Sequence, residues 1–100
     1  MALENLPEPE DERSAAVRDM KRAVASLMEE LQAAAWYDMR VETSKDPRLK
    51  AVLAHNRDEE KEHAAMLLEW IRRNDAVQAK ELKDYLFTEG SITSLEEKNK

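Results

Sequence analysis

Three side chains in this sequence have the types and the spacing needed to bind a metal ion. Glu60 and His63 are three residues apart within the run EEKEH, so on a helix they lie on one face, about one turn apart. Glu30 offers a second carboxylate from an earlier stretch with apolar residues at helical spacing. Two carboxylates with one imidazole suit Fe(II), and Mn or Zn would also fit such a set. The pattern therefore indicates a metal half-site.

Helical phase distinguishes these three residues from the charges around them. At about 100° per residue, Glu60 and His63 fall within roughly 40° of Leu67, in the apolar stripe of their stretch. Their neighbour Glu62 falls about 140° away and faces outward. Glu30 lies about 60° from the centre of the earlier apolar stripe, at its edge. The other members of the stripe around Leu67 are Leu49, Val52, Leu53, Trp70 and Ile71. Inward-facing charges are costly unless a partner such as a cation neutralises them.

Two other interpretations of EEKEH stay open. A run of this composition is usually a solvated charged face, and a buried Glu–His ion pair without a metal would also suit the inward-facing side chains. For Glu30 alone, a surface position is the ordinary expectation, so its case depends on the combination with Glu60 and His63. A zinc-protease site is excluded because the sequence has no His-Glu-x-x-His.

Two long helices must position these residues. The stretch from Glu12 to about Val41 has no Pro or Gly and repeats apolar residues at helical spacing, which predicts a helix of about 30 residues. Residues 42–45 form the connection. Asp46 then supplies an N-cap and Pro47 a first helical position, which predicts a second helix over residues 47–74.

The remaining segments are short. Residues 76–88 are expected to form a short third helix that Gly90 stops. Residues 1–12 hold two Pro and five acidic residues, which predicts a flexible leader. Residues 91–100 are polar and are expected to be a flexible tail, so residues 13–90 make up one helical-hairpin domain.

The composition favours an all-α protein. The 100 residues include one Gly and no Cys, which disfavours turn-rich β folds and excludes Gly-rich phosphate loops and disulfide scaffolds. The net charge of -6 opposes non-specific nucleic-acid binding. No apolar run approaches the ~20 residues of a membrane span, and the acidic N-terminus is unlike a signal peptide. We therefore expect a cytoplasmic protein that binds neither nucleic acid nor membrane.

A hairpin of two long helices cannot bury its apolar stripes alone, and the short third helix cannot cover them. We therefore expect a dimer in which two antiparallel hairpins complete a four-helix bundle. Each hairpin would supply Glu30 and the pair Glu60 and His63. Four-helix di-iron carboxylate proteins use two glutamates and two Glu-x-x-His motifs, so half of the ligand set lies on half of the bundle.

A second face of the first helix also carries unusual residues. Trp36 falls about 180° from the apolar stripe, in the same sector as Glu29 and Gln32. An exposed Trp indicates a further interface, and cover by the third helix is the alternative. Tyr37 falls on the side of Glu30, where it is either a hydrogen-bond partner of a ligand or an ordinary residue at the edge of the core.

The stretches MEELQAAAWYDMRVE, DPRLKAVLAHNRDEEKEHAAMLLEWIRRND and YLFTEG closely resemble the encapsulated ferritins of bacteria and archaea, from about Val24 to Gly90. The resemblance implies a fold like half of a ferritin and a two-chain di-iron site that oxidises Fe(II). It also implies a ring-shaped homodecamer of five dimers inside an encapsulin shell, a nanocompartment in which iron is mineralised. The last ten residues do not resemble the targeting tail in which members of that family end.

The resemblance also implies roles for particular residues. It places the ferroxidase ligands on Glu30, Glu60 and His63, and a Trp-Tyr pair beside the site on Trp36 and Tyr37. A secondary metal-attracting site of the family falls on Glu29 and Gln32, where the neutral Gln is the weaker ligand.

The function expected from the sequence is therefore a ferroxidase with an iron centre, in which Ca, Zn or Mn could substitute. A non-catalytic helical oligomer clamped by a structural divalent metal is the alternative. A metal-free adaptor hairpin is the third hypothesis.

Overall fold

The computed structural model describes residues 14–100, and the leader predicted for residues 1–12 lies outside them. Within the described part the regular structure is helical, in the order α1 (Ala15–Thr43), α2 (Pro47–Asn74), α3 (Ala76–Tyr85) and α4 (Ser94–Lys98). The predicted all-α fold, a long antiparallel helix pair followed by a short helix, is confirmed.

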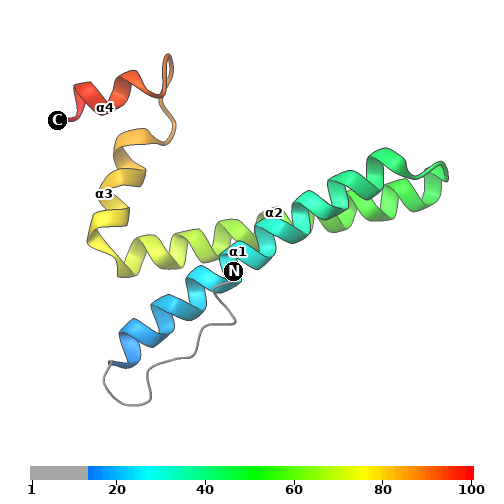
Figure 1. The fold of residues 1–100 in the computed structure, drawn as a ribbon, viewed down its shortest axis with the longest axis horizontal. Helices are drawn as coiled ribbons and strands as arrows, with labels where there is room; N and C mark the ends of the chain where they lie inside the picture. Colours follow the sequence, from blue (N-terminus) through cyan, green and yellow to red (C-terminus); the bar gives the residue numbers. More distant parts are fainter. Residues whose placement is uncertain (1–13) are drawn as a thin grey trace.

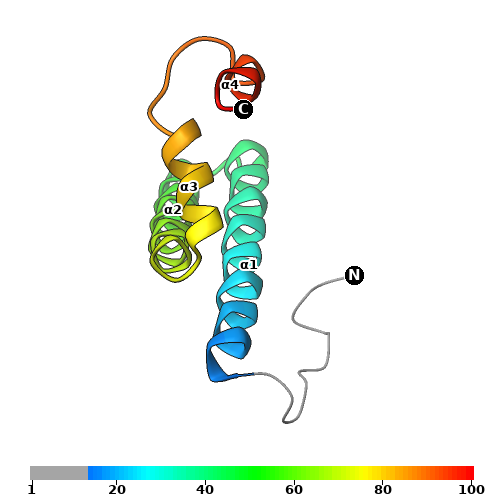
Figure 2. The same ribbon diagram turned by 90° about the vertical axis from the view of Figure 1, so that its left-hand side faces the viewer.

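The helices α1 and α2 lie side by side and run in opposite directions (Figures 1 and 2). Asp46 begins α2 as predicted, because its carboxylate accepts the backbone N–H of Arg48 at 2.9 Å and of Leu49 at 3.4 Å. The first helix is displaced from its predicted bounds. It begins after Ser14, whose hydroxyl accepts the N–H of Val17, and it continues to Thr43, so the connection is shorter than expected.

The contact between α1 and α2 buries little apolar side chain. Five hydrophobic residues are buried among the described residues, namely Ala23, Ala25, Ala34, Ala64 and Ile71. Larger members of the predicted stripe stay open in the single chain, because Leu49 is 48% exposed and Val52 is 55% exposed. The hairpin alone therefore leaves apolar surface uncovered, as the sequence predicted.

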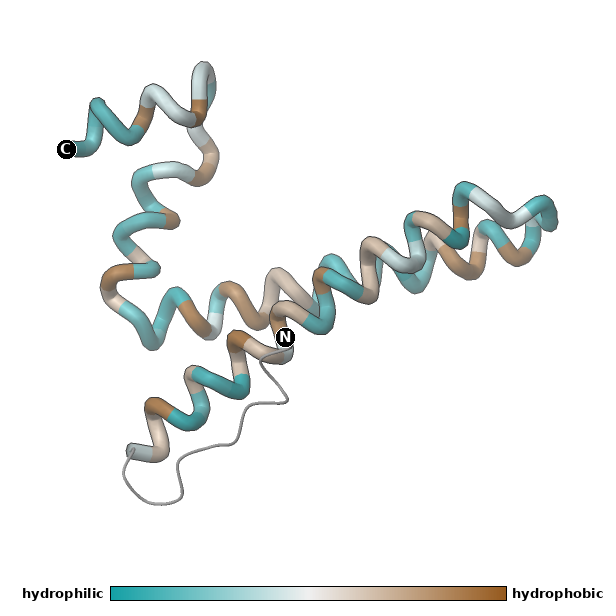
Figure 3. Tube along the Cα trace, viewed as in Figure 1, coloured by the Kyte–Doolittle hydropathy of each residue, from teal (hydrophilic) through white to brown (hydrophobic). Residues whose placement is uncertain are grey.

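Apolar positions recur along both long helices but never dominate either one (Figure 3). Charged residues separate them on the outer faces, as expected for amphipathic helices. None of the helices in residues 14–100 combines the length and the apolarity needed to cross a membrane.

The helix α3 turns away from the end of α2 and contacts it near the bend (Figure 1). It ends at Tyr85 and not at the predicted Thr88, because Leu86 is extended and Phe87 has a left-handed backbone with φ 59°. A single turn of helix, α4, follows in the segment predicted to be a loose tail. The sequence interpretation missed it, although Glu96 and Glu97 in its first turn favour a helix N-terminus.

Candidate metal centre

The candidate ligands project from the middle of the two long helices. Glu30 lies on α1, and Glu60 and His63 lie on the facing side of α2. Two of the buried alanines are next to them in helical register, Ala34 one turn after Glu30 and Ala64 directly after His63. Small side chains at these positions let the helix axes come close, which brings side chains of the two helices within reach of one ion.

The three side chains converge as their helical phase predicted. The Nδ1 atom of His63 lies 3.5 Å from Oε2 of Glu30 and 3.7 Å from Oε2 of Glu60. One ligand atom from each residue lies within 4.8 Å of the other two. Metal–ligand bonds of about 2.1 Å place neighbouring ligand atoms roughly 3 to 3.5 Å apart, close to the separations found here. The spacing therefore suits a shared ion better than direct hydrogen bonds.

Burial supplies a second test of whether these residues fit a cation. The side chains of Glu30 and Glu60 are 26% and 24% exposed, and that of His63 is 40% exposed. The Oε2 atom of Glu30 is fully buried and has no hydrogen-bond partner. A buried carboxylate oxygen without a partner is costly, and a metal ion would satisfy it. The solvated-face interpretation of EEKEH therefore does not describe Glu60 and His63.

A neighbouring ion pair on α2 shows the ordinary alternative. His55 and Glu59 are both well exposed, and Nε2 of His55 lies 2.8 Å from Oε1 of Glu59. These two atoms lie at hydrogen-bonding distance, and both side chains are open to solvent. The contrast weakens the interpretation of Glu60 and His63 as a simple ion pair.

The residues of the second face do not gather further ligands. Glu29 and Gln32 are exposed on α1. Within residues 14–100, Glu30, Glu60 and His63 are the one group of three potential ligands found within 4.8 Å of one another.

The aromatic pair of α1 occupies two different environments. Trp36 is 54% exposed while α3 contacts α2, so the alternative that the chain's own third helix covers Trp36 is wrong. Tyr37 is half-buried, and the guanidinium of Arg40 lies 5.5 Å from the centre of its ring. Its hydroxyl does not donate to the buried Oε2 of Glu30, which has no partner.

One polar contact near the site was missed by sequence reasoning. Nη1 of Arg57 on α2 donates to Oδ1 of Asp38 on α1 at 2.9 Å, and its Nε donates to Oδ1 of Asp58 at 3.0 Å. The hydrogen bond to Asp58, and then the one to Asp38, raise the pKa of Arg57. The signal was present in the sequence, because Asp38 falls only about 20° from Leu27 on the wheel of α1.

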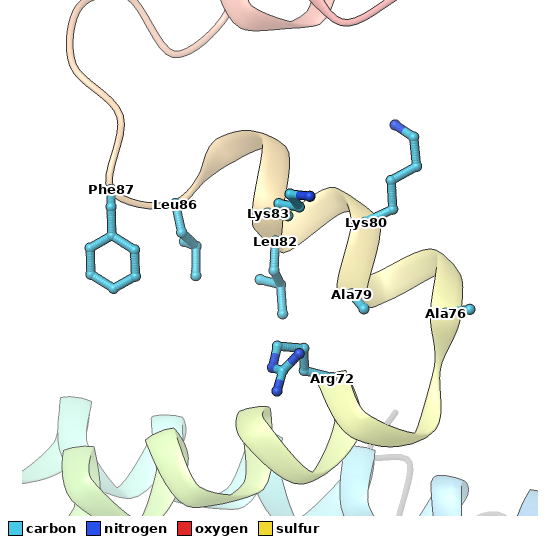
Figure 4. Close-up of a pocket in the computed structure, with 8 residues that line it drawn as sticks. All are labelled: Arg72, Ala76, Ala79, Lys80, Leu82, Lys83, Leu86 and Phe87. Carbon is cyan, nitrogen blue, oxygen red and sulfur yellow. The ribbon is translucent and has the colours of Figure 1, made fainter.

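A second concave region lies at the elbow between α2 and α3 and has a different chemistry (Figure 4). It is a groove of about 670 Å³ lined by Arg72, Ala76, Ala79, Lys80, Leu82, Lys83, Leu86 and Phe87. Three basic side chains and no carboxylate or imidazole line it. This lining disfavours a cation, whereas the candidate ligands lie in the middle of α1 and α2.

Known proteins are similar to this chain in sequence. A family model described as EncFtn-like matches residues 5–89. An encapsulated ferritin-like protein of Rhodospirillum rubrum is 68% identical over 75 residues, which are 75% of this chain and 54% of that protein. The chain thus spans about half the length of that relative. A ferritin-like protein of Thermotoga maritima is 53% identical over 90 residues, 90% of this chain and 79% of that protein.

A solved structure also matches the fold. The crystal structure of a protein from Nitrosomonas europaea superposes with a TM-score of 0.83 and 62% sequence identity. The match covers 88% of this chain and 97% of the other.

Proposed function

This chain belongs to the EncFtn-like family, and from that premise we propose that it is a ferroxidase, which oxidises Fe(II) to Fe(III) at a di-iron site between two subunits. The observation that carries the proposal is the convergence of Glu30, Glu60 and His63 around a carboxylate oxygen that lacks any other partner. The name of the Rhodospirillum rubrum relative, an encapsulated ferritin-like protein, supports the same chemistry.

One subunit supplies half of a di-iron ligand set. Glu30, Glu60 and His63 offer two carboxylates and one imidazole, whereas four-helix di-iron sites use two such sets. A two-fold related hairpin would provide the second set, and Glu30, Glu60 and His63 of the two chains would then hold the two ions. The exposed apolar side chains of both helices support this pairing, namely Met28, Leu31, Leu49, Val52, Met66 and Trp70.

In the reaction each Fe(II) ion, as substrate, loses one electron. The two electrons from one site, with two protons from solvent, reduce dioxygen to hydrogen peroxide, or reduce hydrogen peroxide to two molecules of water. The residues of the chain bind and orient the ions, and the anionic carboxylates stabilise the higher charge of Fe(III). Dimerisation excludes water from the half-buried ligands and strengthens these electrostatic interactions.

The family also suggests where the product goes. We place the protein in an encapsulin nanocompartment within the cytoplasm, with the encapsulin shell protein as its partner, because the name of the Rhodospirillum rubrum relative describes it as encapsulated. A ring of five dimers is the proposed assembly, and the exposed Trp36 is the proposed anchor of its second interface. An open ring has no inner cavity for mineral, so storage would depend on the shell.

Glu29 and Gln32 form the proposed secondary site on the outer face of α1, where they would attract ions weakly. Trp36 and Tyr37 are the proposed neighbours of the metal centre. Both proposals follow from the family resemblance and from the position of these residues on α1.

A structural divalent ion that clamps the dimer without catalysis is the second candidate, because the same three ligands would bind Zn or Mn. Anaerobic loading with Fe(II), followed by exposure to oxygen, separates the two functions. A ferroxidase produces Fe(III) absorbance over repeated turnovers. A clamp binds the metal but oxidises added Fe(II) no faster than buffer does.

A further inference from the structure

An ion pair joins α1 to α2 about one turn before Glu60 on α2 and about two turns after Glu30 on α1. Arg57 is three residues before Glu60, which is about 4.5 Å along the helix axis, and Asp38 is eight residues after Glu30. The guanidinium of Arg57 reaches Asp38 at 2.9 Å and is only 25% exposed, although Asp38 is 52% exposed. The bridge therefore lies between the ligands and the connection that joins the two helices.

The guanidinium is held on both sides. Asp58, on the same helix as Arg57, accepts its Nε at 3.0 Å, while Asp38 of the other helix accepts Nη1. Arg presents donors in a rigid planar fork, so two carboxylates fix its orientation in a way that a single contact does not. The side chain is thereby fixed to α2 and directed at one position of α1.

The fully buried part of the contact between α1 and α2 contains few large side chains. Four of the five buried hydrophobic residues are alanines, which have no shape to interlock along the helix axis. The metal centre nevertheless depends on the relative position of the two helices, because a slip of one turn moves a residue by about 5.4 Å. Such a shift exceeds the 3.5 Å that separates Glu30 from His63.

We propose that Asp38 and Arg57 are positioning residues for the metal centre, which hold α1 and α2 in the register where Glu30 meets Glu60 and His63. The inference rests on the proposed metal binding by those three ligands. Half-exposed ion pairs add little to overall stability, so the effect of this pair is expected on the site rather than on the fold.

The direction in which removing Arg57 changes the affinity for a cation distinguishes a positioning role from a purely electrostatic one. Removing the positive charge of Arg57 next to a cation site would tighten cation binding if charge alone mattered. Loss of register weakens binding instead. Arg57→Ala is therefore expected to bind Co(II), a spectroscopic substitute for Fe(II), about tenfold more weakly, as for supporting residues of metal ligands.

The test is a Co(II) titration of the full chain, followed by visible absorption, whose intensity reports the geometry of the bound ion. Arg57→Ala is compared with Asp38→Asn, which keeps the shape of the side chain and leaves Arg57 bound to Asp58. The double variant Asp38→Arg with Arg57→Asp restores opposite charges across the helices and should recover binding. Arg72→Ala is the matched control, because Arg72 pairs with Glu69 within α2.

Weaker Co(II) binding by Arg57→Ala and Asp38→Asn, with recovery in the double variant and no change in Arg72→Ala, supports the positioning role. Equal or tighter binding by Arg57→Ala overturns it while leaving the metal centre intact. If Arg57→Ala does not fold, as judged by circular dichroism, Asp38→Asn and the double variant decide in the same way. If the unmodified chain binds no Co(II), the metal centre itself is wrong.

Discussion

The helix α2 carries two histidines beside glutamates, and only one of them has the setting of a ligand. Nε2 of His55 and Oε1 of Glu59 lie 2.8 Å apart on an exposed face, where solvent also reaches both groups. Nδ1 of His63 lies 3.7 Å from Oε2 of Glu60 and 3.5 Å from Oε2 of Glu30, among partly buried side chains. This Oε2 atom of Glu30 is buried and accepts no hydrogen bond. Residue type and spacing are similar in the two pairs. Burial and unsatisfied bonding capacity, which come from the opposite helix, make the difference.

The largest expected effect is on iron chemistry. Glu30→Ala, Glu60→Ala and His63→Ala should each lower the rate of Fe(II) oxidation by on the order of 100-fold, because each removes a direct ligand. The measurement is Fe(III) absorbance after oxygen is added to anaerobically loaded protein. His55→Ala is the matched control, since it removes an imidazole of the same helix from a solvent-exposed pair, and its rate should not change.

Two results would break the comparison. If all three ligand variants oxidise iron at the parent rate, the site lies elsewhere. If His55→Ala loses activity as strongly as His63→Ala, burial does not distinguish the two pairs.

Metal binding and dimer formation should be linked, because the proposed ligands come from two chains. At a metal concentration 100 times the dissociation constant, an ion that binds only the dimer stabilises it by about 2.7 kcal/mol. Native mass spectrometry across a metal titration should show ions appearing together with dimers or larger species. Stoichiometric iron on an isolated monomer would contradict this linkage.

The exposed Trp36 should affect assembly but not the metal ligands. An aromatic residue that anchors an interface contributes at least about 2 kcal/mol, so Trp36→Ala should lose the larger assembly and retain dimers. Size-exclusion chromatography and native mass at matched concentration test this. A Trp36→Ala protein that remains fully assembled would show that Trp36 anchors no interface.

The smallest expected effect is on the acid stability of the fold. It concerns Glu69, whose carboxylate accepts hydrogen bonds from arginines and not from a metal site. Hydrogen bonds from Arg72, and then from Arg73, lower the pKa of Glu69 to about 2 from its usual 4.5. Since the folded-state pKa is the lower one, the charged form stabilises the fold above pH 4.5, and this contribution is lost as the pH falls toward 2. As the pH falls from 4.5 to 2, the melting temperature of Glu69→Gln should therefore fall less than that of the parent protein. Identical acid profiles for the two proteins would show that the exposed cluster contributes nothing measurable.

The sequence predicted the convergence of the three ligands because helical phase is a local property. The regular 100° step along each helix assigns Glu60 and His63 to the inner face, and Asp46 with Pro47 marks where α2 begins. Helix ends in the C-terminal part were less predictable. The left-handed backbone of Phe87 ends α3 early, although nothing about its side chain favours that conformation.

Contacts between the helices were harder to predict. The phase of Asp38 shows that it faces α2, but the axial register of the two helices decides that Arg57 is its partner. The axial register depends on the length of the connection and on packing between the helices. A helical-wheel projection of one helix gives neither. The sequence left two environments possible for Trp36 for the same reason. The direction of α3 decides whether that helix covers Trp36.

Anomalous diffraction at the iron edge, from crystals grown with Fe(II), tests the central claim most directly. We expect two peaks between paired subunits, related by the two-fold axis, with Glu60 and His63 of one chain and Glu30 as the ligands of each ion. Iron density on the outer face of α1 or in the elbow between α2 and α3, with none between Glu30, Glu60 and His63, would contradict this claim.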